Sequence, residues 1–189
     1  MKSKSNFANM KTFIALTLIG ILNYAYANKI VPIKECKTVT PMNGFDAKKF
    51  FTGKWYTTHV KNVSSTTVCL TFETSISSDG KFVNDFKYTI NGKENKIHCV
   101  DNGVENDKKM EFKCQKNGVD DFLSDFVILG TDYDDYTVFY RCVTLIKPNI
   151  KADNFLVLRR DAKKTELPEN AKSLTNNLNL QKCSDINKA

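Results

Sequence analysis

The sequence predicts an all-β fold: an eight-stranded antiparallel up-and-down barrel with a short N-terminal helix and a C-terminal helix. Apolar and polar residues alternate along successive segments, which is the period of strands with one buried face. Several segments are separated by Asp79-Gly80, Asn91-Gly92, Asn102-Gly103 and Asn117-Gly118, pairs that supply the positive φ angles of tight hairpins. Sequential strands with one apolar side favour closure into a barrel, because closure leaves no exposed sheet edge.

Residues 1–27 have the features of a secretory signal peptide. Three lysines precede an uncharged apolar run over 12–22, and Ala25-Tyr26-Ala27 is typical of a cleavage site. The run is too short to span a bilayer, and no other apolar run approaches that length. We therefore expect a secreted, extracellular protein that has no membrane partner and begins near Asn28.

The charge pattern indicates a solvated surface. The formal net charge is +7, and three of these charges come from the lysines of the first 27 residues. The remaining lysines alternate with acids, as in 79–87 and 104–113, and form no long basic block. We therefore expect no nucleic-acid partner.

The predicted elements follow one another without a linker. Asp46 is suited to cap a helix that begins at residue 47, and the first strand begins at Gly53. Further strands are expected over 68–76, 82–90, a segment that contains His98, 109–113, 121–129, 135–145 and 154–160. Pro168 is suited to start a helix that carries Leu174 and Leu178 on one face. Residues 28–189 are thus expected to form a single domain.

Six cysteines lie behind the signal segment, at positions 36, 69, 99, 114, 142 and 183. An even count in an exported chain predicts three disulfides, although the sequence alone allows fifteen pairings. None of the cysteines has CxxC spacing, so no zinc site is expected. Asn62-Val63-Ser64 is an N-glycosylation sequon in a loop after the first strand.

The sequence contains no pattern typical of an enzyme. It lacks G-x-S-x-G, H-E-x-x-H and a glycine-rich phosphate loop. Its two histidines, His59 and His98, lie on different predicted strands, and paired cysteines leave no thiol nucleophile. We therefore expect neither catalysis nor a metal site.

Three motifs resemble the lipocalin signatures. Gly53-Lys54-Trp55 matches G-x-W at the first strand, Thr131-Asp132-Tyr133 matches the turn between strands six and seven, and Arg160 ends the eighth strand. The chain is most similar to the triabin/pallidipin-like salivary lipocalins of blood-feeding triatomine bugs, a branch related to the nitrophorins. The residues that carry this closer resemblance are Cys36, 41–45, 50–56, Cys69, 112–114, 125–126, 133–134, Arg141 and 155–158.

The resemblance implies a structural role for Gly53, Trp55 and Arg160, which should meet at the closed end of the barrel. It also implies the disulfides Cys36–Cys142 and Cys69–Cys183. For Cys99–Cys114, the symmetric spacing about 106–107 suggests a bridge across a hairpin. In nitrophorins a histidine ligates haem, but Tyr88 stands at the corresponding position here, so no haem or other cofactor is expected.

Strand alternation predicts which side chains face the cavity. The candidate ligand-binding residues are His59, Asn84, Phe86, Tyr88, Phe126, Phe139 and Arg141. His59, Tyr88 and Arg141 are expected near the open mouth. One arginine in an aromatic-lined pocket suits an amphipathic anion with a carboxylate, as in an eicosanoid. We find no carboxylate on the inward side that would suit a cationic amine.

Members of the resembled family are secreted in saliva and impair host haemostasis. We therefore expect a monomeric inhibitor of platelet aggregation that sequesters a small amphipathic agonist such as a thromboxane-like eicosanoid. One alternative is a triabin-like inhibitor that binds thrombin, a host haemostatic protein, through its outer surface. Another is a carrier of a nucleotide or a biogenic amine. Small inward substitutions redirect lipocalin specificity, so the sequence leaves the ligand open.

Overall fold

The computed structural model describes residues 31–63, 68–90, 92–103 and 109–186. The predicted signal peptide, residues 1–27, lies outside them. Within the described ranges, no helix has the length and apolar character needed to cross a membrane.

The fold is the predicted eight-stranded antiparallel barrel. Each strand pairs with the next, and β1 pairs with both β8 and β2 to close the sheet. The strands are β1 (Gly53–Val60), β2 (Thr71–Ile76), β3 (Phe82–Ile90), β4 (Lys93–Asp101), β5 (Met110–Lys116), β6 (Val119–Thr131), β7 (Tyr136–Leu145) and β8 (Lys151–Arg159).

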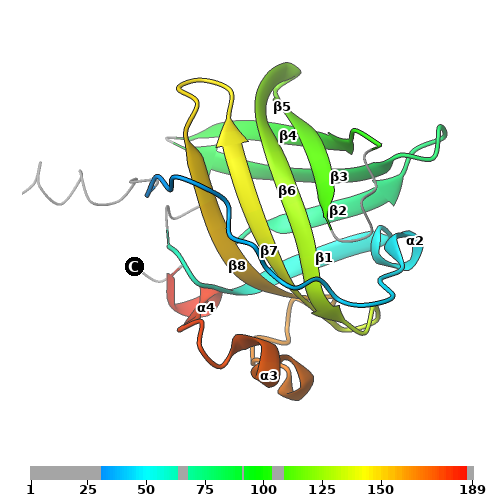
Figure 1. Ribbon diagram of the computed structural model, residues 1–189, viewed down its shortest axis with the longest axis vertical. Helices are drawn as coiled ribbons and strands as arrows, with labels where there is room; N and C mark the ends of the chain where they lie inside the picture. Colours follow the sequence, from blue (N-terminus) through cyan, green and yellow to red (C-terminus); the bar gives the residue numbers. More distant parts are fainter. Residues whose placement is uncertain (1–30, 64–67, 91, 104–108, 187–189) are drawn as a thin grey trace, which may run out of the picture.

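The up-and-down order gives the barrel two different ends. The β5–β6 and β7–β8 connections stand together at the top of Figure 1, and the β6–β7 turn lies at the bottom. The antiparallel order places the β1–β2 and β3–β4 connections at the same end as the β5–β6 and β7–β8 connections. These four connections surround the open mouth. Helix α2 (Ala47–Phe50) lies at the other end, where the Oδ1 atom of Asp46 accepts a hydrogen bond from the Lys49 N–H at 3.1 Å. The expected N-terminal helix and its cap are therefore confirmed.

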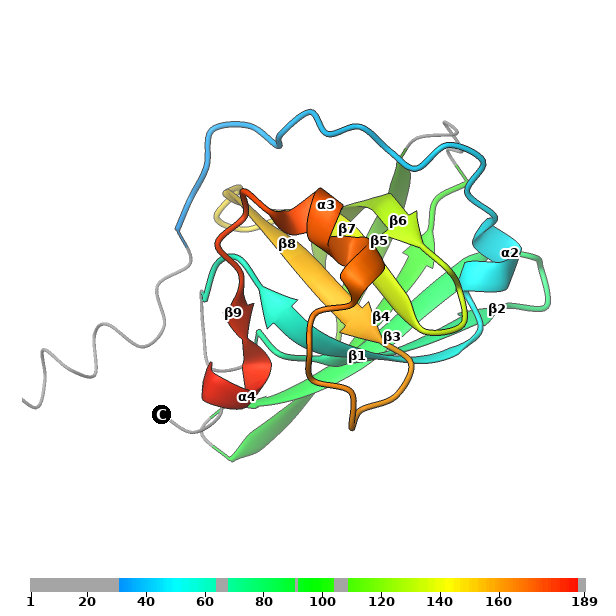
Figure 2. The same ribbon diagram turned by 90° about the horizontal axis from the view of Figure 1, so that it is seen from below.

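The C-terminal segment differs from the expected single helix. It consists of a 3-10 turn, η1 (Glu169–Ala171), then α3 (Lys172–Thr175), β9 (Gln181–Lys182) and α4 (Cys183–Ile186). Asn176 and Asn177 follow α3, and asparagine side chains compete for backbone hydrogen bonds and disfavour helix continuation. Leu178 consequently lies beyond the helix. Figure 2 shows the segment passing along the outside of the barrel, where β9 pairs with the upper part of β1.

Three disulfides hold the chain together. Cys36–Cys142 attaches the N-terminal segment to β7, and Cys69–Cys183 attaches the C-terminal segment beside β2. Cys99–Cys114 joins directly paired residues of β4 and β5 and is fully buried. The three expected pairings are therefore present in the structure.

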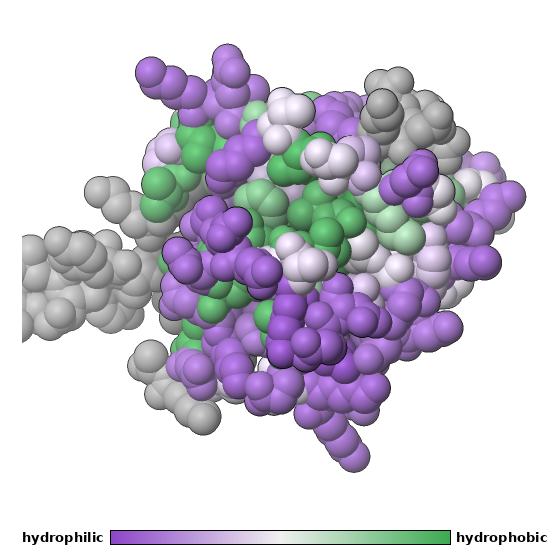
Figure 3. Space-filling model, turned by 60° about the horizontal axis from the view of Figure 1, so that its bottom comes forward, coloured by the Kyte–Doolittle hydropathy of each residue, from purple (hydrophilic) through white to green (hydrophobic). Residues whose placement is uncertain are grey.

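The outer surface carries both hydrophilic and apolar side chains. On the face shown in Figure 3, hydrophilic side chains cover the lower half, and apolar side chains gather nearer the middle. The charged residues are interspersed: ten of the twelve ion pairs in the described part of the chain join a lysine to an acid, as in Lys54–Glu73 at 2.8 Å. This pattern agrees with the solvated surface that the sequence predicts.

Candidate binding site at the barrel mouth

The closed end is sealed by Arg160 and Trp55. The guanidinium carbon of Arg160 lies 3.6 Å from the centroid of the Trp55 ring. Arg160 also donates hydrogen bonds to backbone carbonyls of Phe50 (3.2 Å), Lys54 (3.1 Å) and Tyr133 (3.0 Å), and to that of Thr52. The three lipocalin motifs therefore meet at one point, which leaves the opposite end as the way into the barrel.

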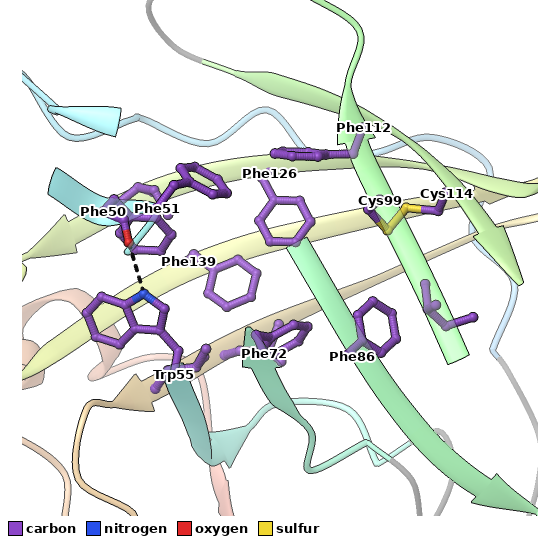
Figure 4. Close-up of a cluster of buried hydrophobic side chains, with 14 of the residues drawn as sticks. Phe50, Phe51, Trp55, Phe72, Phe86, Cys99, Phe112, Cys114, Phe126 and Phe139 are labelled. Atoms are coloured by element: carbon purple, nitrogen blue, oxygen red, sulfur yellow. Dashed lines mark hydrogen bonds between the residues drawn. A yellow bond between two sulfur atoms is a disulfide. The ribbon is translucent and has the colours of Figure 1, made fainter. Parts of the chain in front are cut away.

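Above this floor, phenylalanine rings fill the middle of the barrel (Figure 4). Phe126 and Phe139 are stacked with their centroids 5.1 Å apart, and Phe72 and Phe112 meet this pair edge to face at 6.3 and 5.1 Å. All four side chains are buried. The rings form a layer, and the open space at the mouth end lies above it.

That space is a pocket of about 470 Å³, within the range of small-molecule sites. It is lined mainly by apolar side chains from β3, β6, β7 and β8 and from the segment that joins β1 to β2. The lining residues are Val31, Lys61, Asn62, Val63, Val68, Leu70, Phe86, Tyr88, Asp121, Phe122, Arg141, Val143, Leu145, Ala152, Asp153, Asn154, Leu156 and Gln181.

Arg141 is the central polar group of the pocket. Its guanidinium carbon lies 5.0 Å from the ring centroid of Phe86, 5.6 Å from that of Phe122 and 5.7 Å from that of Phe126. Its Nε donates to the Ser124 hydroxyl at 3.0 Å, and no carboxylate among the described residues pairs with it. Burial lowers the pKa of Arg141 to about 10, so the group stays charged at neutral pH. The pocket thus contains a cation without a counter-ion.

Two further candidates, Phe86 and Tyr88, line the same pocket from β3. Lys116 approaches the Tyr88 ring, with its Nζ 6.0 Å from the centroid. Three of the seven candidate residues, Phe86, Tyr88 and Arg141, therefore line the mouth pocket together. Tyr88 and Arg141 were expected near the mouth, and Phe86 was expected only to face the cavity.

The expected inward position of His59 is wrong. The β1–β8 pairing shifts between Thr57 and His59, and this bulge reverses the alternation above it. Thr57 pairs with Leu158 and Val60 with Leu156, both in the main core, whereas His59 pairs with Val157, which packs with Ala171 outside the barrel. His59 also pairs with Lys182 of β9, so it is buried between the wall and the C-terminal segment.

Three other candidates lie deeper than the pocket. Phe126 and Phe139 belong to the ring layer, and Asn84 is 1 % exposed below Phe86 on β3. Neither amide atom of Asn84 has a hydrogen-bond partner within the described ranges, and the same holds for the Thr57 hydroxyl. These side chains face inward as expected, but they do not line the mouth pocket.

The structure also corrects the expectation that no carboxylate faces inward. Asp101 ends β4 directly opposite Phe112, whose side chain is fully buried, and cross-strand partners share a face of the sheet. One carboxylate oxygen of Asp101 is buried without a partner in the described part of the chain. Asp101 does not line the mouth pocket; it lies towards the closed end.

Strand β8 also forms part of the pocket wall, although none of the seven candidate residues lies on it. Asn154 and Leu156 line it, and Asn154 accepts hydrogen bonds from the backbone N–H groups of Lys61 and Asn62 at 3.1 and 2.9 Å. The amide of Asn62 donates to the Asp153 carbonyl at 3.1 Å, so the sequon asparagine is engaged at the rim. Arg141 pairs directly with Asn154, so the two side chains share a face of the sheet. The alternation along β8 could therefore have identified Asn154 and Leu156 as inward residues.

A second hollow, of about 800 Å³, lies at the closed end between segment 40–48 and the barrel wall. Its walls include Met42, Phe45, Met110 and Ile128, and none of the described residues that line it has a buried unpaired polar atom. The described residues contain no group of three or more His, Cys, Asp or Glu side chains that would hold a metal ion.

The comparisons with known proteins agree with this architecture. The family model described as Triabin matches residues 26–174. Procalin of Hospesneotomae protracta is 36% identical over 92% of this chain and 99% of its own length. Triabin of Meccus pallidipennis is 33% identical over 83% of this chain and 96% of its own length. A solved structure of the LTBP1 complex with leukotriene C4 is 28% identical, with a TM-score of 0.61 over 81% of this chain and 96% of that chain.

These relatives are salivary lipocalins of triatomine bugs, which implies secretion. They are binding proteins rather than enzymes. The group as a whole supports a haemostasis-related binding role for this chain. The family model covers most of the chain, and the barrel, the floor motifs and the mouth pocket fit it. The chain belongs to the triabin family of lipocalins.

Proposed function

We propose that this protein inhibits platelet aggregation by sequestering an amphipathic anionic agonist, a thromboxane-like eicosanoid, in the mouth pocket. The observation that carries the proposal is the Arg141 guanidinium, which has aromatic rings around it and no acidic partner among the described residues. A buried cation is costly unless a counter-charge satisfies it. A ligand carboxylate on Arg141 would supply that charge, and the apolar wall would hold the hydrocarbon chain.

The similarity to LTBP1 supports this ligand class, since that protein is solved with leukotriene C4, an eicosanoid. The position of Arg141 also disfavours the amine alternative, because a cationic ligand would be repelled at the base of the pocket. The thrombin alternative has no specific contact in its support, and a clotting assay with purified thrombin tests it directly.

Calorimetric titration tests the proposal, with a stable thromboxane analogue and leukotriene C4 as ligands. Arg141→Gln should weaken binding by the value of a charge-assisted hydrogen bond, about 1.5–3 kcal/mol or roughly 10- to 150-fold. Arg141→Lys should retain part of the affinity, because it keeps the charge and loses the planar fork. Lys163→Gln, at an exposed site in the C-terminal segment, serves as the charge-matched control.

Two results would overturn the proposal. The first is the absence of binding heat with either eicosanoid. The second is unchanged affinity in Arg141→Gln, which would place the ligand elsewhere. Urea unfolding of each variant checks that the fold is retained, because Arg141 forms a hydrogen bond with Ser124 and contacts three aromatic rings. We also propose that residues 1–27 are removed on secretion and that Asn62 is glycosylated; N-terminal sequencing and glycosidase treatment of the secreted protein test these two points.

A further inference from the structure

The mouth of the barrel carries exposed aliphatic side chains on every one of its four connections. Val63 follows β1, Ile90 ends β3, Val119 begins β6 and Ile146 follows β7. Their exposed fractions are 41%, 39%, 70% and 44%. These four residues, here called the mouth rim, make up half of the exposed large hydrophobic side chains in the described part of the chain. Exposed aliphatic side chains are therefore more concentrated around the opening of the barrel than over the rest of its described surface.

Each rim residue has a lysine close to it in the sequence. Lys61, Lys93, Lys116 and Lys147 stand within three residues of Val63, Ile90, Val119 and Ile146, in that order. None of these lysines forms an ion pair within the described ranges. Three acids near the mouth, Glu94, Asp120 and Asp153, are each paired with another lysine. Asp121, which also lines the pocket, forms no ion pair within the described ranges. The rim therefore combines aliphatic tips with an excess of positive charge.

We propose that the mouth rim docks on an anionic lipid surface. The charge of the four lysines complements acidic headgroups, and separate aliphatic tips around an opening suit shallow insertion between lipid chains. A protein partner would be expected to meet a contiguous centre rich in Trp, Tyr or Arg, which these tips do not form. This revises the expectation, drawn from the lack of a spanning segment, that the protein has no membrane partner.

Docking in this orientation has a consequence for the pocket. Val63 lines the pocket as well as standing on the rim, so the opening lies in the plane of the contact. An amphipathic lipid would pass between the bilayer and the pocket with little exposure to water. The inference itself depends only on the rim and holds whichever ligand the pocket carries.

Vesicle sedimentation tests the proposal, with the protein secreted by insect cells that express the full chain and then treated with a glycosidase, because a glycan on Asn62 would stand beside Val63 of the rim. The vesicles are phosphatidylcholine alone and phosphatidylcholine with phosphatidylserine. The protein should sediment with the second kind only, and sodium chloride should weaken binding. Lys93→Gln/Lys147→Gln should lower the partition coefficient about 25-fold, from roughly fivefold per lysine near an anionic surface. Lys48→Gln/Lys163→Gln, away from the mouth, should leave it unchanged.

The apolar part of the contact has its own matched pair. Val119→Ser/Ile146→Ser should weaken binding by roughly tenfold through lost apolar burial. The control, Ile76→Ser/Leu174→Ser, removes two other exposed aliphatic side chains (41% and 38%), both away from the rim, and should have no effect. Far-ultraviolet circular dichroism checks that each variant is folded. Lys93→Gln/Lys147→Gln tests the rim independently, because it removes charge and leaves the aliphatic side chains in place.

Three results would overturn the proposal. One is equal binding, or no binding, to the two kinds of vesicle. Another is an equal loss of binding in the rim variants and their controls, which would place the contact elsewhere. The third is concentration-dependent dimerisation that Val119→Ser/Ile146→Ser abolishes, without vesicle binding, which would assign the rim to a second copy of the chain.

Discussion

Replacing Arg160 by alanine should open the floor of the barrel and lower the free energy of unfolding by about 3–5 kcal/mol. The side chain reaches three separate parts of the chain: the end of α2, the start of β1 and the β6–β7 turn. A hydrogen bond from a charged donor contributes roughly 1.5–3 kcal/mol, and the contact with Trp55 contributes roughly 0.5–2 kcal/mol. The carbonyls left behind lie at the barrel end where water reaches them, so the total should fall well below the simple sum.

Guanidinium chloride unfolding measures this effect, with Trp55 as the natural probe because it is the only tryptophan. Arg160→Lys should keep a positive charge above the Trp55 ring but lose the planar guanidinium that donates to several carbonyls. It should therefore lower the free energy of unfolding by about half as much as Arg160→Ala. Eicosanoid affinity should be unchanged in both variants, since the floor lies at the opposite end from the pocket. A loss below about 1 kcal/mol in Arg160→Ala, or full stability in Arg160→Lys, would contradict the assigned role of the guanidinium.

Two further predictions concern buried polar groups. Burial lowers the pKa of His59 below 6.5, so the unfolded chain takes up a proton first as the pH falls. The free energy of unfolding should therefore decrease below pH 6.5 by up to about 1.4 kcal/mol per unit until the folded pKa is reached; this slope should disappear in His59→Gln and persist in His98→Gln. Asn84→Leu should leave stability unchanged or raise it by about 1 kcal/mol, because it removes an unpaired buried amide. A clear destabilisation in urea unfolding would show that the Asn84 amide is hydrogen-bonded in the folded protein.

Strand alternation identified inward residues correctly where the strands pair without interruption. The β3 pairings with β2 and β4 have no register shift, and Asn84, Phe86 and Tyr88 all face inward. On β7, placing Cys142 outward for its disulfide placed Phe139 and Arg141 inward, and the structure agrees. A fixed two-residue period carries such an inference along a strand as long as no residue is inserted.

His59 shows where that reasoning fails. The β1 bulge adds one residue opposite β8, and nothing in the local sequence marks it, because Thr57 and Thr58 are both compatible with a regular strand. The C-terminal segment was equally hard to predict, since β9 depends on pairing with β1 rather than on its own two residues. The sequence also could not predict that Phe126 and Phe139 lie below the mouth pocket. Alternation shows which face of the sheet a side chain is on but not how it packs with its neighbours.

The disulfides change what a protease can do to this molecule. The Cys36–Cys142 bridge spans one stretch of the chain and Cys69–Cys183 spans another, and the two stretches overlap between residues 69 and 142. Every peptide bond from Cys36 to Cys183 therefore lies inside at least one covalent ring. A single cut anywhere in that range leaves both fragments joined, so the nicked protein should migrate as one species on a gel until its disulfides are reduced.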